Sequence, residues 1–280
     1  MSTILHISDL HFGPPYLPKV GQALLRVVPA LAPQAIVVSG DLTQRAKSEQ
    51  FADARAYIDS LPDVPKIVVP GNHDVPLYRI AERLFDPHGL YQHHISTELN
   101  QVLRMENVII AALDTTAPRR HITNGRIVQQ HLDFCTTAFR DAAPEVAKIV
   151  VAHHHFAPAP DYQRDEVMPQ AKKAMNHFID LGVEMILGGH LHRGYIGNSL
   201  DMYPKANHHH GVIIVQCGTT TSRRGRARER EKNSFNLVHV ARDMLRVSHY
   251  MYFDDVDAFE PISRHVFPRP GRRLSHDATL

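Results

Sequence analysis

The sequence lacks several features that would each mark a particular class of protein. Cys135 and Cys217 are its only cysteines, too few for a disulfide framework, which favours a reducing, cytoplasmic setting. No apolar run approaches the roughly 18 residues of a membrane-spanning helix, so we expect none. The first residues carry no basic region and lead straight into a predicted strand, so we expect no signal peptide. The formal net charge of +2 gives no sign of a dedicated nucleic-acid-binding protein.

Histidine, in contrast, is abundant, with 21 residues among 280. Histidine is the commonest metal ligand in proteins and titrates near neutral pH, so the excess points to metal or acid–base chemistry. The hydrophobic content of 43% and charged content of 21% are those of an ordinary globular protein. A chain of this length can bury a large core.

Short apolar runs alternate with helix-like segments through the first two thirds of the chain. This alternation predicts a layered α/β fold. The predicted strands are 3–8, 35–40, 66–71, 108–114, 147–153 and 183–189, and the predicted helices are 20–31, 48–61, 129–142 and 171–181. After residue 211 only strands are predicted, at 211–217, 234–240 and 244–253. We expect one domain over 1–260, followed by a C-terminal arm or partly disordered tail over 261–280.

Polar residues of a metal-binding kind follow five of these strands. Because ligand sites form at the carboxyl ends of strands in α/β sheets, we expect the five groups to converge on one crevice. Carboxylate, imidazole and amide oxygen are ligands for Zn, Mn or Fe. The set is too large for one ion and suits two metals about 3.5–4 Å apart. The groups are Asp9 with His11, Asp41, Asn72 with His73 and Asp74, His153 with His154 and His155, and His190 with His192.

In this order, the motifs D-x-H, G-D, G-N-H-D, H and G-H-x-H resemble those of the calcineurin-like metallophosphoesterase superfamily, over residues 3–220. The resemblance implies a four-layer α/β/β/α sandwich with mixed sheets. It also implies a ligand set. Asp9, His11 and His192 would hold the first metal, Asn72, His153 and His190 the second, and Asp41 would bridge the two. His154 is the main competitor of His153, which is preferred because it directly follows the apolar strand.

The same resemblance implies a mechanism for phosphoester hydrolysis. A hydroxide that bridges two divalent metals, of Mn, Fe or Zn type, would attack phosphorus. In the family the histidine of G-N-H-D faces the substrate, so His73 would stabilise phosphoryl charge or protonate the leaving oxygen. Asp74 would orient His73, through a hydrogen bond to its ring nitrogen.

Among the branches of the superfamily, "ISDLHFG", "GDLTQ", "PGNHD", "AHHHF" and "GGHLH" most resemble bacterial class III cyclic nucleotide phosphodiesterases. Ala46 stands where the Ser/Thr protein phosphatases have glycine, and Gln44 where purple acid phosphatases have a tyrosine ligand. Phe156 follows the histidine run where this group often has proline, so we expect a different substrate loop. The expected substrate is a cyclic nucleotide or similar small diester, and relatives of this kind suggest a homodimer without membrane contact.

Three alternatives stay open on the sequence. A nuclease acting on single-stranded or damaged DNA could grip phosphates with the arginines of residues 222–230, although a solvated connection between strands is the simpler interpretation. A phosphomonoesterase would need more cationic donors than Arg193, the one arginine on the close flanks of the motifs. A non-catalytic scaffold would be expected to lose ligands, and all are present here. His208, His209 and His210 are interpreted as a solvated loop.

Overall fold

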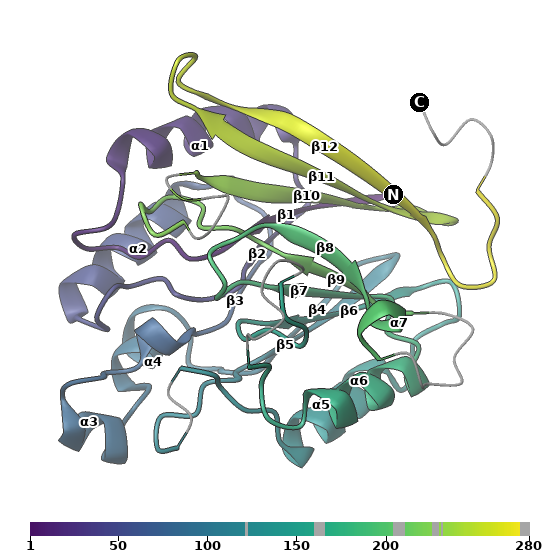
Figure 1. Cartoon of the computed structure of the whole chain (residues 1–280), viewed down its shortest axis with the longest axis horizontal. Coiled ribbons are helices and arrows are strands. Elements are labelled where there is room, and N and C mark those ends of the chain that lie inside the picture. Colours follow the sequence, from purple (N-terminus) through teal and green to yellow (C-terminus); the bar gives the residue numbers. More distant parts are fainter. Residues whose placement is uncertain (121–122, 160–165, 204–210, 226–229, 231, 275–280) are drawn as a thin grey trace.

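The computed structural model describes residues 1–120, 123–159, 166–203, 211–225, 230 and 232–274. Two six-stranded sheets lie face to face between two layers of helices (Figure 1). The predicted α/β/β/α fold with mixed sheets is thereby confirmed. The helices are α1 (Pro18–Leu31), α2 (Ser48–Ser60), α3 (Ile80–Phe85), α4 (Gly89–His94), α5 (Gln129–Phe139), α6 (Ala171–Asp180) and α7 (Ser199–Met202).

The first sheet combines a parallel half with an antiparallel half, in the order β12-β11-β10-β1-β2-β3. Strands β1, β2 and β3 are parallel, and each runs into one of the predicted metal-binding motifs. Strand β10 pairs antiparallel with β1 and begins the meander that β11 and β12 complete. The bounds are β1 (Ser2–Ile7), β2 (Ala35–Val38), β3 (Lys66–Val68), β10 (Ser234–Val240), β11 (Met244–Phe253) and β12 (Ala258–Pro268).

The second sheet has the order β4-β5-β6-β7-β9-β8. Its four central strands are parallel, and the antiparallel strands β4 and β8 form its edges. Strands β6 and β7 run into the two remaining histidine motifs. The bounds are β4 (Gln101–Arg104), β5 (Val108–Leu113), β6 (Ala147–Ala152), β7 (Met185–Gly188), β8 (Tyr195–Asn198) and β9 (Ile213–Gln216).

Burial on both faces explains why the strands are nearly continuous apolar runs. Successive side chains of a strand point to opposite faces. In β1, Ile4 therefore packs between the sheets with Ile149 and Leu187, whereas Leu5 and Ile7 belong to the cluster beneath α1 and α2. Helices α5 and α6 cover the outer face of the second sheet (Figure 1). This sandwich holds the carboxyl ends of the parallel strands in fixed positions.

Part of the expected C-terminal tail is a strand. Strand β12 runs past the predicted boundary at residue 260 and pairs with β11 as far as Pro268. Pro261 fits into this strand because β12 is an edge strand, where proline is tolerated. Just beyond it, buried Arg269 makes ion-paired hydrogen bonds of 2.7 and 2.8 Å to Glu184, which joins the end of the first sheet to the second. Residues 275–280 lie outside the described part.

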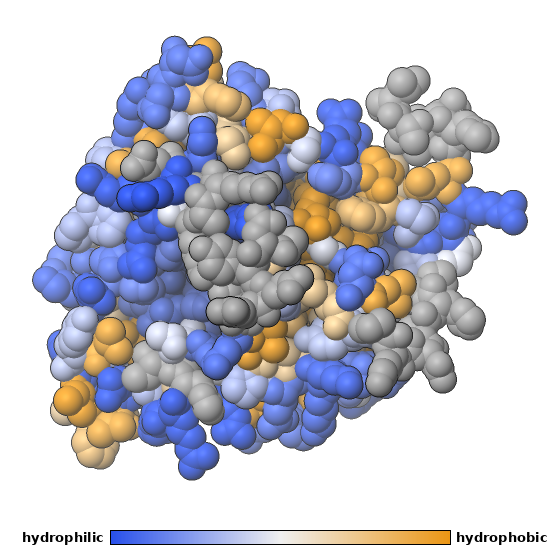
Figure 2. Space-filling model, viewed as in Figure 1, coloured by the Kyte–Doolittle hydropathy of each residue, from blue (hydrophilic) through white to orange (hydrophobic). Residues whose placement is uncertain are grey.

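The sequence analysis also missed the short elements β4, β8, α3, α4 and α7. Helix α3 has no buried residue, and Ile80, Leu84 and Phe85 are exposed on it. Figure 2 shows apolar side chains gathered over this helix, at the lower left. Among the helices that the structure describes, none is both long and apolar enough to cross a membrane.

Candidate metal centre

The five predicted motifs meet at one edge of the two sheets, where β1, β2, β3, β6 and β7 end. Five of the seven predicted ligands have left-handed backbone conformations, with φ between 50° and 73°. Such conformations are uncommon in residues other than glycine and cluster at functional sites, because the surrounding structure must stabilise them. These five residues are Asp9, His11, Asp41, His190 and His192.

One group of donors comprises Asp9, His11, Asp41 and His192, whose ligand atoms all lie within 4.8 Å of one another. Oδ1 of Asp9 lies 3.1 Å from Nε2 of His192 and 3.6 Å from Nε2 of His11. Oδ2 of Asp41 is also 3.6 Å from Nε2 of His11. These residues correspond to the predicted first metal position together with the predicted bridging aspartate.

The chemistry of this group fits a bound cation. Oδ2 of Asp9 accepts hydrogen bonds from Ser8 Oγ and from the backbone N–H of His190, but Oδ1 is buried without a hydrogen-bond partner in the described structure. Oδ2 of Asp41 is buried in the same way. Burial lowers the pKa of His11 to about 4, which keeps the ring in the neutral form that binds metals. Uncompensated carboxylate oxygens of this kind are unfavourable unless a positive charge neutralises them.

A second group surrounds the side-chain oxygen of Asn72. Oδ1 of Asn72 lies 2.9 Å from Nδ1 of His190 and 3.2 Å from Nε2 of His153. Oδ1 of Asp41 is 3.4 Å from the same His153 nitrogen. Asp41 therefore presents one carboxylate oxygen to each group, as a bridging ligand must. Burial lowers the pKa of His153, but the charge and hydrogen bond of Asp41, the charge of Asp9 and the Ser39 carbonyl together raise it to about 9. The surroundings of His153 therefore favour a positive charge.

His154 lies beside this second group and, in the described structure, makes none of its contacts to Asp41. Its Nδ1 is 2.8 Å from Thr115 Oγ1, and its Nε2 is buried without a hydrogen-bond partner in the described structure. The donor atoms of His153, His154 and His190 nevertheless lie within 4.8 Å of one another. His155 stacks on His190, with ring centroids 5.5 Å apart. The contacts to Asp41 and Asn72 are made by His153, the residue preferred from the sequence.

His73 adjoins the first group. Its ring meets that of His11 edge to face, with centroids 4.9 Å apart, and its Nδ1 donates a hydrogen bond of 2.9 Å to the carbonyl oxygen of Gln44. Burial lowers the pKa of His73, and the positive charge of Arg224 contributes in the same direction, while the Asp41 carboxylate opposes both. His73 thus stands next to the metal ligands without a contact that would make it one.

The predicted role of Asp74 needs correction. Its carboxylate accepts hydrogen bonds from the backbone N–H groups of Leu42, Thr43 and Gly71, at 2.8 to 3.0 Å, and none from the His73 ring in the described structure. Gln44 orients that ring instead. Asp74 holds the loop after β2 against the loop after β3, because its two oxygens satisfy backbone donors of both. The sequence could not show this, since backbone partners leave no motif.

Arg224 lies near the site, and the sequence analysis considered it only among the arginines of residues 222–230 in the nuclease alternative. Its Nη1 donates to Oε1 of Gln44 at 3.0 Å. The residue belongs to the segment that was interpreted as a solvated connection, and no motif marks it. Residues 226–229 of that segment lie outside the described residues, as do the histidines 208–210.

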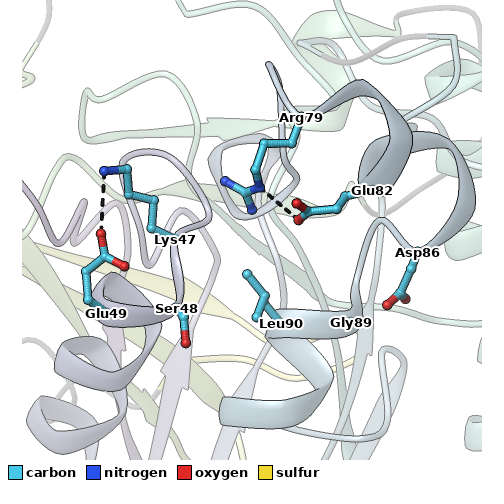
Figure 3. A pocket seen from close by; sticks show the side chains of 8 residues that line it. All are labelled: Lys47, Ser48, Glu49, Arg79, Glu82, Asp86, Gly89 and Leu90. Atoms are coloured by element: carbon cyan, nitrogen blue, oxygen red, sulfur yellow. Dashed lines mark hydrogen bonds and ion pairs between the residues drawn. The ribbon is translucent and has the colours of Figure 1, made fainter.

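A surface pocket of about 760 Å³ lies between the start of α2 and helices α3 and α4 (Figure 3). None of the predicted metal ligands lines it. Four of its five charged side chains are paired within the pocket, Lys47 with Glu49 at 3.5 Å and Arg79 with Glu82 at 2.8 Å, and Asp86 is the fifth. These internal pairs leave little net charge to recognise a ligand. The motif residues, and not this pocket, form the candidate functional site.

Comparison with known proteins shows that residues 2–194 match the family of calcineurin-like phosphoesterases. A "Probable cyclic nucleotide phosphodiesterase" of Rhodococcus erythropolis is 25% identical over 205 residues, which cover 68% of this chain and 64% of that protein. A "Transmembrane protein with metallophosphoesterase domain" of Danio rerio is 25% identical over 196 residues, which cover 68% of this chain and 40% of that protein. The chain therefore spans less than two thirds of the length of either relative.

Solved structures show the same fold at low sequence identity. A purple acid phosphatase from seeds of yellow lupin (Lupinus luteus) matches with a TM-score of 0.73 and 11% identity, over 96% of this chain and 54% of its own. The structure of PhoD matches with a TM-score of 0.62 and 9% identity, over 94% of this chain and 71% of its own. At these identities the likeness concerns the arrangement of sheets and helices.

Proposed function

This chain belongs to the calcineurin-like phosphoesterase family, and from that premise we propose that it is a metal-dependent phosphodiester hydrolase. The observation that carries the proposal is the convergence of six donor residues around Asp41, whose carboxylate oxygens face both groups. The residues are Asp9, His11 and His192 for one divalent ion, Asn72, His153 and His190 for the other, and Asp41 for both. Bound there, Mn, Fe or Zn would polarise a phosphoryl oxygen and activate water as the nucleophile.

The residues around the donors would orient the substrate and move protons. His73 donates from Nδ1 to the Gln44 carbonyl, so proton exchange with the substrate falls to its Nε2. A proton held there would pass to the leaving oxygen or stabilise charge on the phosphoryl group. Asp74 would position the metal ligands indirectly, because its hydrogen bonds hold the loops that carry Asp41 and Asn72.

Two features support a diester, with a cyclic nucleotide or similar small diester as the substrate. The motifs resemble those of class III cyclic nucleotide phosphodiesterases, and the relative from Rhodococcus erythropolis has the name of a probable cyclic nucleotide phosphodiesterase. We also propose a cytoplasmic setting, for which Cys135 and Cys217 give support, since both are buried and free.

A substrate panel on metal-reconstituted protein tests the proposal. It compares bis-p-nitrophenyl phosphate with p-nitrophenyl phosphate, and includes 2′,3′- and 3′,5′-cyclic nucleotides, glycerophosphodiesters and single-stranded DNA. We expect kcat/KM to be higher for the diester than for the monoester with the same metals, and at least one cyclic nucleotide to be hydrolysed. A preference for the monoester with Mn, Fe and Zn alike would contradict a phosphodiesterase. Preferred cleavage of single-stranded DNA would identify a nuclease instead.

A further inference from the structure

The segment of residues 219–224, distant in sequence from the motifs, is bound to the loop that carries Asp9 and His11. Thr219 Oγ1 donates to the carbonyl oxygen of Asp9 at 2.8 Å, and Thr221 Oγ1 donates to that of Leu10 at 3.1 Å. These contacts are buried, so the segment has a fixed position over the end of β1. Further backbone hydrogen bonds join Thr220 N to Ser8 O, Arg223 N to Pro15 O and Leu17 N to Thr221 O.

The two arginines at the end of this segment lie in different surroundings. Arg224 is half-buried and donates from Nη1 to Oε1 of Gln44, whose backbone carbonyl accepts from His73. Arg224, Gln44 and His73 therefore form one chain of contacts that ends beside His11. Arg223 is exposed and lines a separate pocket with Leu17, Tyr252 and Asp254. Of these two arginines, Arg224 is the one positioned to act at the metal centre.

The chemistry of Arg224 suits an anionic ligand. In the part of the chain that the structure describes, no carboxylate forms an ion pair with its guanidinium, and Gln44 is the acceptor of its one side-chain hydrogen bond. A guanidinium has five N–H donors in a fixed plane, so most remain available after that contact. Their geometry matches the oxygens of a phosphate group, which arginine binds better than other side chains do.

We propose that Arg224 binds a non-bridging phosphoryl oxygen of the substrate on the side of the site where His73 lies. The proposal rests on the proposed phosphoesterase function and adds a residue to it. Gln44 holds the guanidinium in place, and the hydrogen bonds of residues 219–221 fix the segment from which it extends. Arg224 thus supplies a positive charge that the sequence motifs themselves do not contain.

The test measures the affinity for inorganic phosphate by calorimetry, and the metal content by elemental analysis, on metal-reconstituted protein. Arg224→Gln should weaken phosphate binding roughly 10- to 100-fold, as expected for the loss of a hydrogen bond to a charged group. The metal content should not change, because Arg224 contacts no predicted ligand. Arg224→Lys should recover part of the affinity, since it restores the charge without the planar donor geometry. The matched control Arg223→Gln should behave as the unsubstituted protein.

An affinity for phosphate that is the same in Arg224→Gln and Arg223→Gln would overturn the proposal, and so would loss of metal in the Arg224 variant alone. Unsubstituted protein that holds its metals and binds no phosphate would also overturn it. The outcome is separable from that of the proposed function. If the protein cleaves phosphodiesters while Arg224→Gln binds phosphate normally, only the role of Arg224 fails. If phosphate binding depends on Arg224 and no ester is cleaved, the hydrolase function fails.

Discussion

Nε2 of His11 lies 3.0 Å from Nε2 of His192, and the two ring planes are perpendicular. Two imidazole nitrogens this close cannot both present lone pairs to each other without a proton or a metal ion between them. Burial lowers the pKa of His11 to about 4, so the ring is uncharged at neutral pH and, with its one proton on Nδ1, has a lone pair on Nε2. Oδ1 of Asp9, 3.1 Å from the His192 nitrogen, adds a negative charge at the same point. A divalent cation satisfies all three atoms.

The first prediction concerns metal stoichiometry. Elemental analysis of reconstituted protein should give two divalent ions per chain, because the donors form two groups that share Asp41. Asp41→Ala should lower the occupancy of both positions, whereas His11→Ala should mainly weaken the first. Saturation of the unsubstituted protein at one ion would contradict a two-metal centre.

The second prediction concerns His73. His73→Ala should keep both metals, because the ring touches His11 only edge to face and gives no ligand atom to either donor group. Turnover should fall by about 10²–10⁴-fold for simple diesters, the usual effect of a general acid. The loss should be smaller for p-nitrophenyl esters, whose leaving group needs no proton. His93→Ala, which changes an exposed histidine, is the control. Equal losses for good and poor leaving groups would show that His73 is not the acid.

The third prediction concerns Asp74. Asp74→Asn replaces one acceptor oxygen by an amide donor, which would face backbone N–H groups. The free energy of unfolding of metal-free protein, measured in urea, should fall by about 1–3 kcal/mol, the cost of leaving buried donors unpaired. Metal affinity should fall as well, since the loops of Asp41 and Asn72 lose their common anchor. Asp53→Asn, on the exposed face of α2, should change neither, and equal stability of the two variants would refute the anchoring role.

The fourth prediction concerns pH and His249, which is buried on β11 with its Nδ1 2.8 Å from Oδ1 of Asn236. Burial, and then the charge of His265, lower the pKa of His249 to about 4. The unfolded chain, with a histidine pKa near 6.5, therefore binds more protons than the folded chain between pH 6.5 and pH 4. This contribution to stability is complete above that window and is lost as the pH falls through it.

Urea unfolding of metal-free protein at pH 7 and pH 5 measures the effect. His249 should account for about 2 kcal/mol of the stability lost between these pH values. In His249→Asn the amide N–H can still donate to Asn236, but the side chain does not titrate, so this variant should lose less stability. The same loss in both proteins would mean that His249 does not titrate with the expected shift.

The sequence by itself predicted the layered fold, and it predicted that the candidate ligand residues lie close together. Asp9, Asp41, Asn72, His153 and His190 each follow a buried parallel strand within a few residues. In parallel α/β sheets the carboxyl ends of strands meet at one edge, so a local pattern was enough to place distant residues together. The apolar runs of the same strands predicted burial on both faces, and the helices between them predicted the covering layers.

Only the tertiary structure decided the contacts that depend on strand order. Strand β10 pairs beside β1, and this brings the preceding segment with Arg224 to Gln44, 180 positions away in the sequence. Asp74 accepts hydrogen bonds from backbone N–H groups of the loop after β2. Strand β12 tolerates Pro261 because it lies at the edge of its sheet. Hydrophobic periodicity specifies which face of an element is buried, but not which neighbour covers it. That choice follows from how the whole chain packs, so these features could not be predicted from the local sequence.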